Sequence, residues 1–194
     1  MTLKNVKPDY WVSVGNAFFG DLETGEVISV PSIKQVGIKE DKAEQKLYGS
    51  GRVYEVVSQT TSTEITVDAI ALPQDLVNAY LGRTIDGAAN EQKTTDRLKE
   101  FAYGYSIMYA SGKQIFKWFP RCQMTSADES ISTKTADAVD PNRQYVIVSM
   151  PLDSNVVRVE YDQTLEKEGE TPITEEKFFS KVLKSAAEVK TVAA

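Results

Sequence analysis

The sequence contains no histidine and only one cysteine, Cys122. Without an imidazole, the Ser-His-Asp and Cys-His catalytic arrangements, the histidine-containing zinc sites and the usual proton shuttle near neutral pH are excluded. One cysteine cannot form a disulfide within the chain, and its aromatic neighbourhood favours a small core residue over a nucleophile. We therefore expect no enzyme, and neither a metal nor a cofactor.

Long hydrophobic runs are also absent. No stretch approaches the roughly 18 consecutive apolar residues of a transmembrane helix, and residues 1–8 lack the apolar core of a signal peptide. We expect no membrane contact and synthesis in a cytoplasm. The length of 194 residues, with 41% hydrophobic and 26% charged residues, predicts a single domain over 1–194 with a loose arm at 1–9 and a frayed tail at 188–194.

The net charge of −6 argues against a protein that grips nucleic acid, because sequence-independent affinity comes from Lys and Arg side chains that neutralise phosphates. The same charge permits DNA to pass, since an acidic wall repels phosphate over about 8 Å at physiological salt. Alternating aromatic residues at 101–109 could stack on bases, but such platforms need a positively charged groove. Packing in the core is the simpler interpretation.

The remaining chemical motifs are weak. Glu160 and Asp162 lie two apart on an expected strand and could act as paired carboxylates, but acidic side chains at a strand end usually face solvent. The same holds for Asp137 and Asp140. The Gly49-Ser50-Gly51 run lacks the third glycine and the following helix of a dinucleotide site.

The centre of the chain predicts two strands followed by a short helix. Residues 47–55 form the first strand, and a polar break at 58–61 follows it. Residues 63–71 then alternate between a buried face and a wet face that carries Glu64, Thr66 and Asp68. Residues 73–82 then form a helix: Pro73 suits its first turn, and Gly82 suits a left-handed C-terminal position.

Other segments add strands and one more helix. The patterns predict a hairpin at 10–30, a second hairpin from 101–109 to 114–119 with its turn at Ser111-Gly112, and a short buried strand at 145–148. Residues 83–99 are expected to be a long surface loop. Thr174 caps a predicted C-terminal helix at about 174–186. The fold class is mainly β (α+β): an antiparallel β-sandwich or partial barrel with one flanking helix.

A dense run of mixed charges occupies residues 40–46. Such runs are usually solvated loops or turns, and this is the favoured interpretation. The alternative is a loop that docks on the next copy of the protein.

The order of these segments resembles the major tail (tail tube) proteins of long-tailed bacteriophages with non-contractile tails. The resemblance covers roughly residues 12–185. It is carried by the runs Leu47-Tyr48-Gly49-Ser50, Thr63-Glu64-Ile65-Thr66-Val67, Ala71-Leu72-Pro73, Phe101-Ala102-Tyr103-Gly104-Tyr105, Phe116-Lys117-Trp118-Phe119-Pro120 and Ser132-Thr133-Lys134-Thr135.

The resemblance implies a structural virion protein. Its subunits would form hexameric rings that stack into a hollow tube around a tape-measure protein, with tail-tip or baseplate and tail-terminator proteins as further partners. The lumen would later conduct DNA. Within this interpretation we expect Glu64, Thr66 and Asp68 to face the lumen, and the ring-to-ring contacts to involve Glu40, Asp41, Lys42, Glu44, Lys46, Lys4 and Lys7.

Two other functions stay open at this point. One is a monomeric β-sandwich binding module of a baseplate or surface-recognition apparatus. The other is a hydrolase that works with carboxylates alone.

Overall fold

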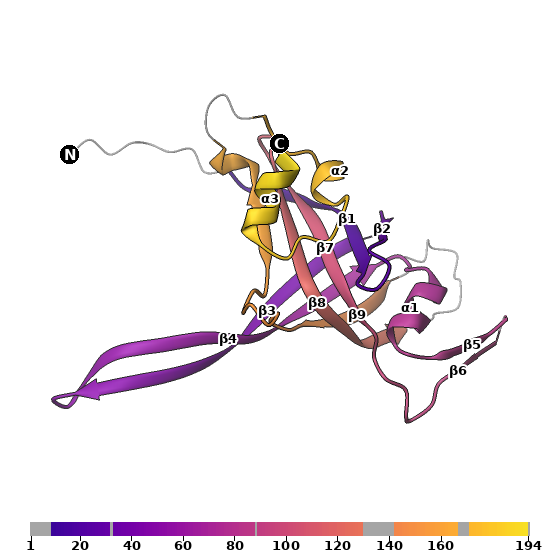
Figure 1. The fold of residues 1–194 in the computed structure, drawn as a ribbon, viewed down its shortest axis with the longest axis horizontal. Helices are drawn as coiled ribbons and strands as arrows, with labels where there is room; N and C mark the ends of the chain where they lie inside the picture. Colours follow the sequence, from indigo (N-terminus) through magenta and orange to yellow (C-terminus); the bar gives the residue numbers. More distant parts are fainter. Residues whose placement is uncertain (1–8, 32, 88, 130–141, 167–170, 194) are drawn as a thin grey trace, which may run out of the picture.

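The computed structural model describes residues 9–31, 33–87, 89–129, 142–166 and 171–193. One curved antiparallel sheet of eight strands dominates it, in the order β2-β1-β7-β8-β9-β4-β3, with β10 paired to β8, and it does not close into a barrel (Figure 1). The sheet strands are β1 Trp11–Asp21, β2 Val27–Val30, β3 Ile33–Gly49, β4 Arg52–Ala69, β7 Glu100–Tyr109, β8 Gln114–Glu129, β9 Arg143–Ser149 and β10 Val159–Asp162.

The remaining elements are short. A separate two-stranded ribbon forms within the segment that was expected to be a loop. The elements are α1 Gln74–Tyr80, β5 Thr84–Asp86, β6 Ala89–Glu91, the 3-10 turn Gln163–Leu165, α2 Glu175–Phe178 and α3 Ala186–Ala193. The prediction of a long surface loop over residues 83–99 was therefore wrong in part, because Gly87, with φ of 59°, lets this segment turn back on itself as a strand pair.

The concave side of the sheet holds the main core. Alternate residues of β7 point into it, and α1 closes it: the rings of Tyr80 and Phe101 stack with centroids 4.0 Å apart. Gly82 ends this helix with φ of 71°, as expected from its sequence position. Both the aromatic hairpin and the flanking helix are thus confirmed, and the aromatic residues serve the core.

The opposite side of β1, β7 and β8 is covered by the C-terminal segments. Gly104 leaves room for the ring of Phe179, since an added Cβ would lie 2.7 Å from that ring. Phe179 also stacks on Phe18 at 3.7 Å between centroids and meets Trp118 edge-on at 5.2 Å. The small residues of β7 therefore have a packing role: they admit a second core.

The C-terminal helix differs from its prediction. Thr174 caps α2 as expected, because its Oγ1 accepts from the Lys177 amide at 3.3 Å, but the helix ends at Phe178. Just beyond it, Ser180 Oγ donates to the Lys177 carbonyl at 2.7 Å, and Phe178 and Phe179 are both buried. A new helix begins at Ala186, where Ser185 Oγ accepts from the Glu188 amide, and it runs to Ala193, whereas the sequence predicted a frayed tail from residue 188.

The hairpin of β3 and β4 is the largest departure from expectation. Residues 40–46 were predicted as a solvated loop and residues 58–61 as a break, yet both lie inside strands of 17 and 18 residues. The two strands pair from Ile33–Ala69 to Gly49–Arg52 and extend well beyond the body of the molecule (Figure 1). The polar character of these residues reflects a strand pair exposed on both faces.

Candidate functional site

The hairpin tip carries exposed apolar side chains on both of its strands. Its turn places Ser50 and Gly51 at φ of 50° and 76°, which is the geometry of a tight two-residue hairpin loop. The large apolar side chains beside it are between 41% and 84% exposed: Leu47, Tyr48, Val53, Tyr54, Val56 and Val57. Soluble monomers rarely gather so many exposed large apolar side chains in one place, so the tip indicates a contact with another chain.

The strand edges of the hairpin are equally open. β3 ends the sheet, and β9 pairs with β4 only between Thr63 and Ala69. Over the described residues, the outer part of the hairpin therefore has no strand neighbour on either side. Unpaired edges present rows of backbone donors and acceptors that another strand can complete.

The charged residues of β3 fall on two faces. Glu40, Lys42, Glu44 and Lys46 alternate along the strand and share one face, whereas Asp41 points to the other. The structure thus brings together four of the residues expected at ring-to-ring contacts. Lys4 and Lys7 lie outside the described residues.

A chain of ion pairs joins this charged face to the body. Lys42 Nζ lies 3.0 Å and Arg158 Nη1 3.7 Å from the Glu40 carboxylate, and Arg158 Nε and Lys117 Nζ both lie 3.4 Å from Glu160. The hydrogen bond from Lys42, followed by the charge of Arg158, lowers the pKa of Glu40 below its ordinary value of 4.5. These contacts hold the base of the hairpin against β8 and β10.

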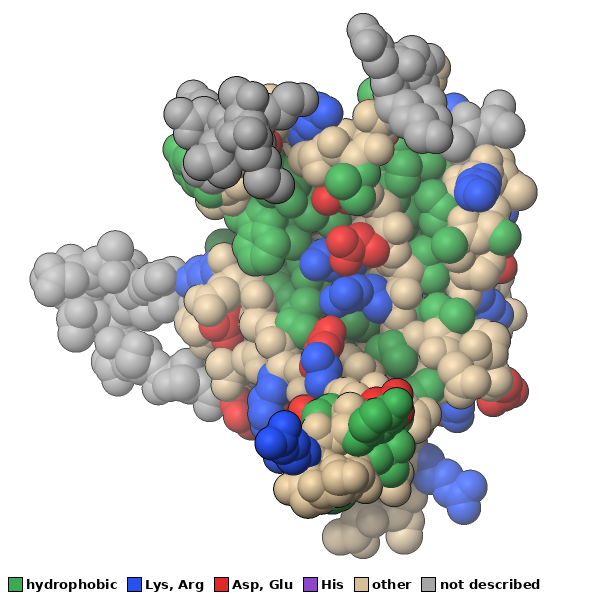
Figure 2. All heavy atoms as spheres, turned by 90° about the vertical axis from the view of Figure 1, so that its left-hand side faces the viewer, with side chains coloured by type: hydrophobic (Ala, Val, Ile, Leu, Met, Phe, Trp, Pro, Cys, Tyr) green, Lys and Arg blue, Asp and Glu red, His purple; other side chains and the backbone are tan. Residues whose placement is uncertain are grey.

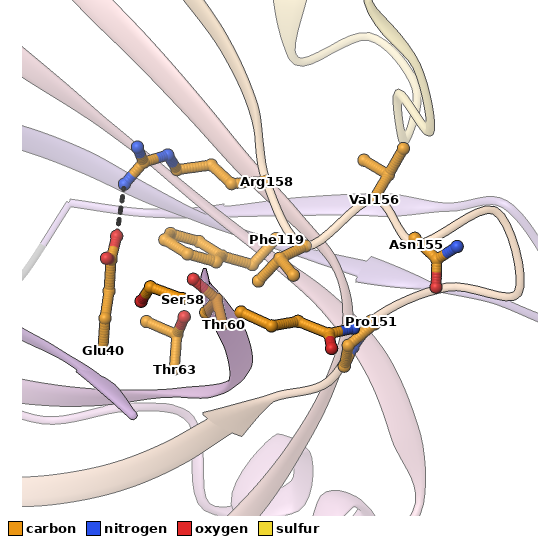
Figure 3. A pocket seen from close by; sticks show the side chains of 11 residues that line it. Glu40, Ser58, Thr60, Thr63, Phe119, Pro151, Asn155, Val156 and Arg158 are labelled. Carbon is orange, nitrogen blue, oxygen red and sulfur yellow. Dashed lines mark ion pairs between the residues drawn. The ribbon is translucent and has the colours of Figure 1, made fainter. Parts of the chain in front are cut away.

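A hollow of about 530 Å³ lies beneath this ion-pair chain (Figure 3). Glu40, Thr60 and Thr63 approach it from the hairpin, Phe119 forms part of its wall, and the segment that runs from Pro151 to Arg158 closes it from the other side. The described part of the chain has no group of three or more His, Cys, Asp or Glu side chains that could hold a metal. The hollow separates the hairpin from the body.

The residues that the sequence offered as possible catalytic groups have structural roles where the structure describes them. Glu160 is engaged by Lys117 and Arg158, and the Asp162 carboxylate accepts from the Thr164 amide at 2.8 Å and so caps the 3-10 turn. Asp137 and Asp140 lie outside the described residues. Cys122 is fully buried, and its burial raises the thiol pKa to about 12, which suppresses the thiolate needed for nucleophilic attack.

The three lumen candidates lie on one open face of β4. Glu64, Thr66 and Asp68 are half-buried and alternate with fully buried Ile65 and Val67, so the predicted wet and buried faces are present. Asp68 accepts a hydrogen bond from Gln144 Nε2 on β9 at 3.0 Å. The alternation is a property of the subunit, and the role of this face stays a prediction.

Sequence reasoning missed the hairpin tip and a second apolar surface at the start of β1. Tyr48, Tyr54 and Trp11 are 70%, 84% and 63% exposed. Figure 2, in which the hairpin points toward the viewer, shows hydrophobic side chains at the tip and a row of acidic and basic side chains above it. Aromatic and Val residues in a strand ordinarily signal burial, so the sequence carried no sign that these would be exposed.

Taken together, the mainly β fold, the unpaired hairpin and the uncovered apolar tip define a structural subunit. In the described part of the chain, no helix is both long and apolar enough to cross a membrane. A profile of the phage tail tube proteins matches residues 33–186. The chain therefore belongs to the phage tail tube protein family, which is a structural family and not one of enzymes.

Solved structures are also similar to this chain. A chain of the sheath-tube complex of an extracellular contractile injection system in its extended state is 15% identical with a TM-score of 0.46, and covers 76% of this chain and 87% of its own length. The tube-terminating cap of the anti-feeding prophage is 13% identical with a TM-score of 0.49, and the match covers 82% of this chain and 96% of the cap chain. Hcp1 from Flavobacterium johnsoniae is 12% identical with a TM-score of 0.37, and the match covers 76% of this chain and 99% of the Hcp1 chain.

The comparison with curated protein sequences returned no match.

Proposed function

We propose that this tail tube protein self-assembles into stacked hexameric rings that form the tail tube of a siphophage, the conduit through which DNA is ejected into the host. The observation that carries the proposal is the β3–β4 hairpin, whose apolar tip and open edges have no cover within the described chain. In the proposed assembly, the hairpin tip of one copy contacts a different surface of the next copy. Such contacts are heterologous, and they close into rings when the rotation returns on itself.

The proposed partners follow from this role. Other copies of the chain build the tube, a tape-measure protein fills the lumen during assembly, and tail-tip or baseplate and tail-terminator proteins bind the two ends. The protein is made in the bacterial cytoplasm and resides in the virion tail. The net charge of −6 supports passage of DNA without specific binding.

We further propose that β3 and β4 contribute to the inner sheet, with Glu64, Thr66 and Asp68 toward the lumen. The support is the polar, open face that these residues share with Gln144. A thiol at position 68 tests this: in Asp68→Cys tubes, a maleimide on a polymer too wide for the lumen should label only the unassembled subunits. Rapid labelling of intact tubes would place position 68 outside and refute the proposal.

Assembly itself is tested by negative-stain electron microscopy beside sedimentation velocity at several subunit concentrations. We expect rings or tubes for the unmodified protein and a large loss of tubes for Tyr54→Ser at the hairpin tip. Ile85→Ser is the matched control, because Ile85 is also an exposed apolar strand residue, at 47%, but belongs to the separate ribbon.

A strictly monomeric protein, even after addition of the tail-tip and tape-measure proteins, would contradict the tube and support a monomeric binding module. Equal loss of tubes in both variants would show that the hairpin tip has no special part in assembly.

A further inference from the structure

A second apolar surface lies in the gap that the curved sheet leaves open between β1 and β3. This groove has a volume of about 580 Å³. Trp11 and Val12 form one wall, Val36 and Ile38 the other, and Tyr105 lies between them in the lining. Trp11 and Val12 are 63% and 60% exposed, so this wall is open to a partner.

The groove exists because two strand edges approach without pairing. β2 covers β1 only from Ala17 onward, where Ala17 faces Val30. Over the described residues, the edge of β1 from Trp11 to Asn16 has no strand partner on that side, and β3 is the end of the sheet. An added strand or hairpin can supply both apolar cover and backbone hydrogen bonds at such a place.

The hairpin tip has the chemistry to fill this groove. The lining contains the cations Lys34, Lys117 and Arg158 and no carboxylate, and Glu160 pairs with Lys117 and Arg158 from outside the lining. Lys117 Nζ already lies 6.0 Å from the centroid of the Trp11 ring. The tip brings Tyr48 and Tyr54, whose ring faces attract cations, and the carboxylate of Glu55.

A chain cannot fill its own groove in this way. Ile38 and Tyr48 lie on the same extended strand, so at about 3.4 Å per residue they are roughly 34 Å apart. The tip extends away from the body, as Figure 1 shows. A second copy must therefore supply the tip.

The geometry points to the β1–β3 groove as the seat of the hairpin tip of a second copy of this chain. The inference rests on the proposed self-assembly and names the two surfaces that meet. Each copy offers one tip and one groove, so every contact leaves a tip and a groove free for the next copy.

The size of this contact sets how it behaves. Aromatic side chains bury about 150–250 Å² each, so Tyr48, Tyr54 and Trp11, with their aliphatic neighbours, remove on the order of 1,000 Å² in total from water. This lies at the lower limit of about 1,000–1,200 Å² for a specific stable interface. A single contact is weak and a repeated one is strong, which favours monomers at low concentration and cooperative growth above a threshold.

The test is a disulfide cross-link between copies. In tubes of the double variant Tyr54→Cys with Trp11→Cys, mild oxidation should give a ladder of covalent oligomers on a non-reducing gel. The double variant Tyr54→Cys with Ile85→Cys is the control and should give none. The native Cys122 is fully buried and does not compete.

A second measurement covers variants that assemble poorly. Tyr54→Ala and Trp11→Ala should each raise the critical subunit concentration for tube formation by about tenfold, with the double variant little worse than either alone, because both remove the same contact. Independent, multiplicative effects would overturn the pairing.

The outcomes separate this inference from the proposed function. Tubes that form without the ladder would overturn the groove assignment and leave self-assembly intact. If the thiol of Trp11→Cys resisted alkylation in unassembled subunits, the groove would already be covered without a second copy. Its occupant would then be the chain's own residues 1–8, and the inference would be wrong. Failure of the unmodified protein to form tubes with its tail partners would overturn both.

Discussion

Arg158 Nη1 lies 3.7 Å from Glu40 Oε1 and connects the segment before β10 to the base of the long hairpin. Both side chains are about one-third exposed, so the pair stabilises the fold only weakly, by about 0.2–1 kcal/mol. Its importance is geometric, because it spans the hollow between the hairpin and the body.

Glu40→Gln should lower the melting temperature slightly at neutral pH. The folded-state pKa of Glu40 is depressed, so its contribution is present above the ordinary value of 4.5 and is lost as the pH falls through the lower folded value. The melting curves of the unmodified protein and the variant should therefore differ at about pH 6 and converge near about pH 3. Glu44→Gln is the control, since Glu44 forms no ion pair with any described residue. An equal change in melting temperature in both variants would contradict the role of Glu40.

Gly104→Ala should lower the free energy of unfolding by about 1–3 kcal/mol, because the added Cβ would lie 2.7 Å from the Phe179 ring and 2.9 Å from the Trp118 ring. Gly37→Ala is the matched control in another strand, where the nearest atom would be Thr66 Cβ at 3.7 Å, an ordinary contact. Urea denaturation measures both. A neutral Gly104→Ala would show that Phe179 can move aside.

Two of the buried tyrosines, Tyr103 and Tyr145, should respond in opposite ways to replacement by phenylalanine. Tyr103 Oη has no hydrogen-bond partner among the described residues, and burial raises its pKa well above 10.0. Tyr103→Phe should therefore stabilise the protein by about 1 kcal/mol. Tyr145 Oη accepts from the Leu72 amide at 3.3 Å, so Tyr145→Phe should cost about 1–3 kcal/mol. Thermal unfolding of both variants decides this; equal destabilisation would contradict the contrast.

Cys122 should resist thiol reagents in the folded subunit. It is fully buried, and its pKa of about 12 leaves almost no thiolate at pH 8. A chromogenic disulfide reagent should react with one thiol in guanidinium and with none in buffer, while the exposed thiol of Tyr54→Cys reacts at once. Fast reaction of the native protein would show that the core opens.

Deletion of residues 1–7, which include Lys4 and Lys7, should shorten the tubes without changing the melting temperature of the subunit. The reason is the proposed role of this arm in bridging rings. Electron microscopy and calorimetry on the same preparation measure both quantities. Unchanged tube length would remove the arm from the ring-to-ring contact.

The parts of the fold that follow from the sequence are those with a buried face. Strand β7 alternates large and small residues because two different cores lie on its two sides, and Phe116 and Trp118 of β8 fill the core that its small residues leave open. The helix α1 carries its signals at both ends, with Pro73 before it and Gly82 after it. In both places local pattern and tertiary packing agree.

The outer half of the β3–β4 hairpin carries no such signal. It has no buried face in the subunit, so its residues show no alternation of apolar and polar types, and residues 40–46 look like a solvated loop. The apolar residues of its tip look like core residues in the sequence, because Val and aromatic residues in a strand ordinarily indicate burial. A surface completed by another copy cannot be separated from a core, or from a loop, by the sequence of one chain.

The pairing of β4 with β9 has a mechanical consequence. A pull on the hairpin tip loads β3 and β4 side by side, so the long ladder between them carries little of the force. The load passes instead to the ladder from Thr63–Ser149 to Ala69–Arg143, whose hydrogen bonds lie across the direction of pull and must yield together. In a tail held together by such hairpins, this short ladder would set the tensile strength of each subunit.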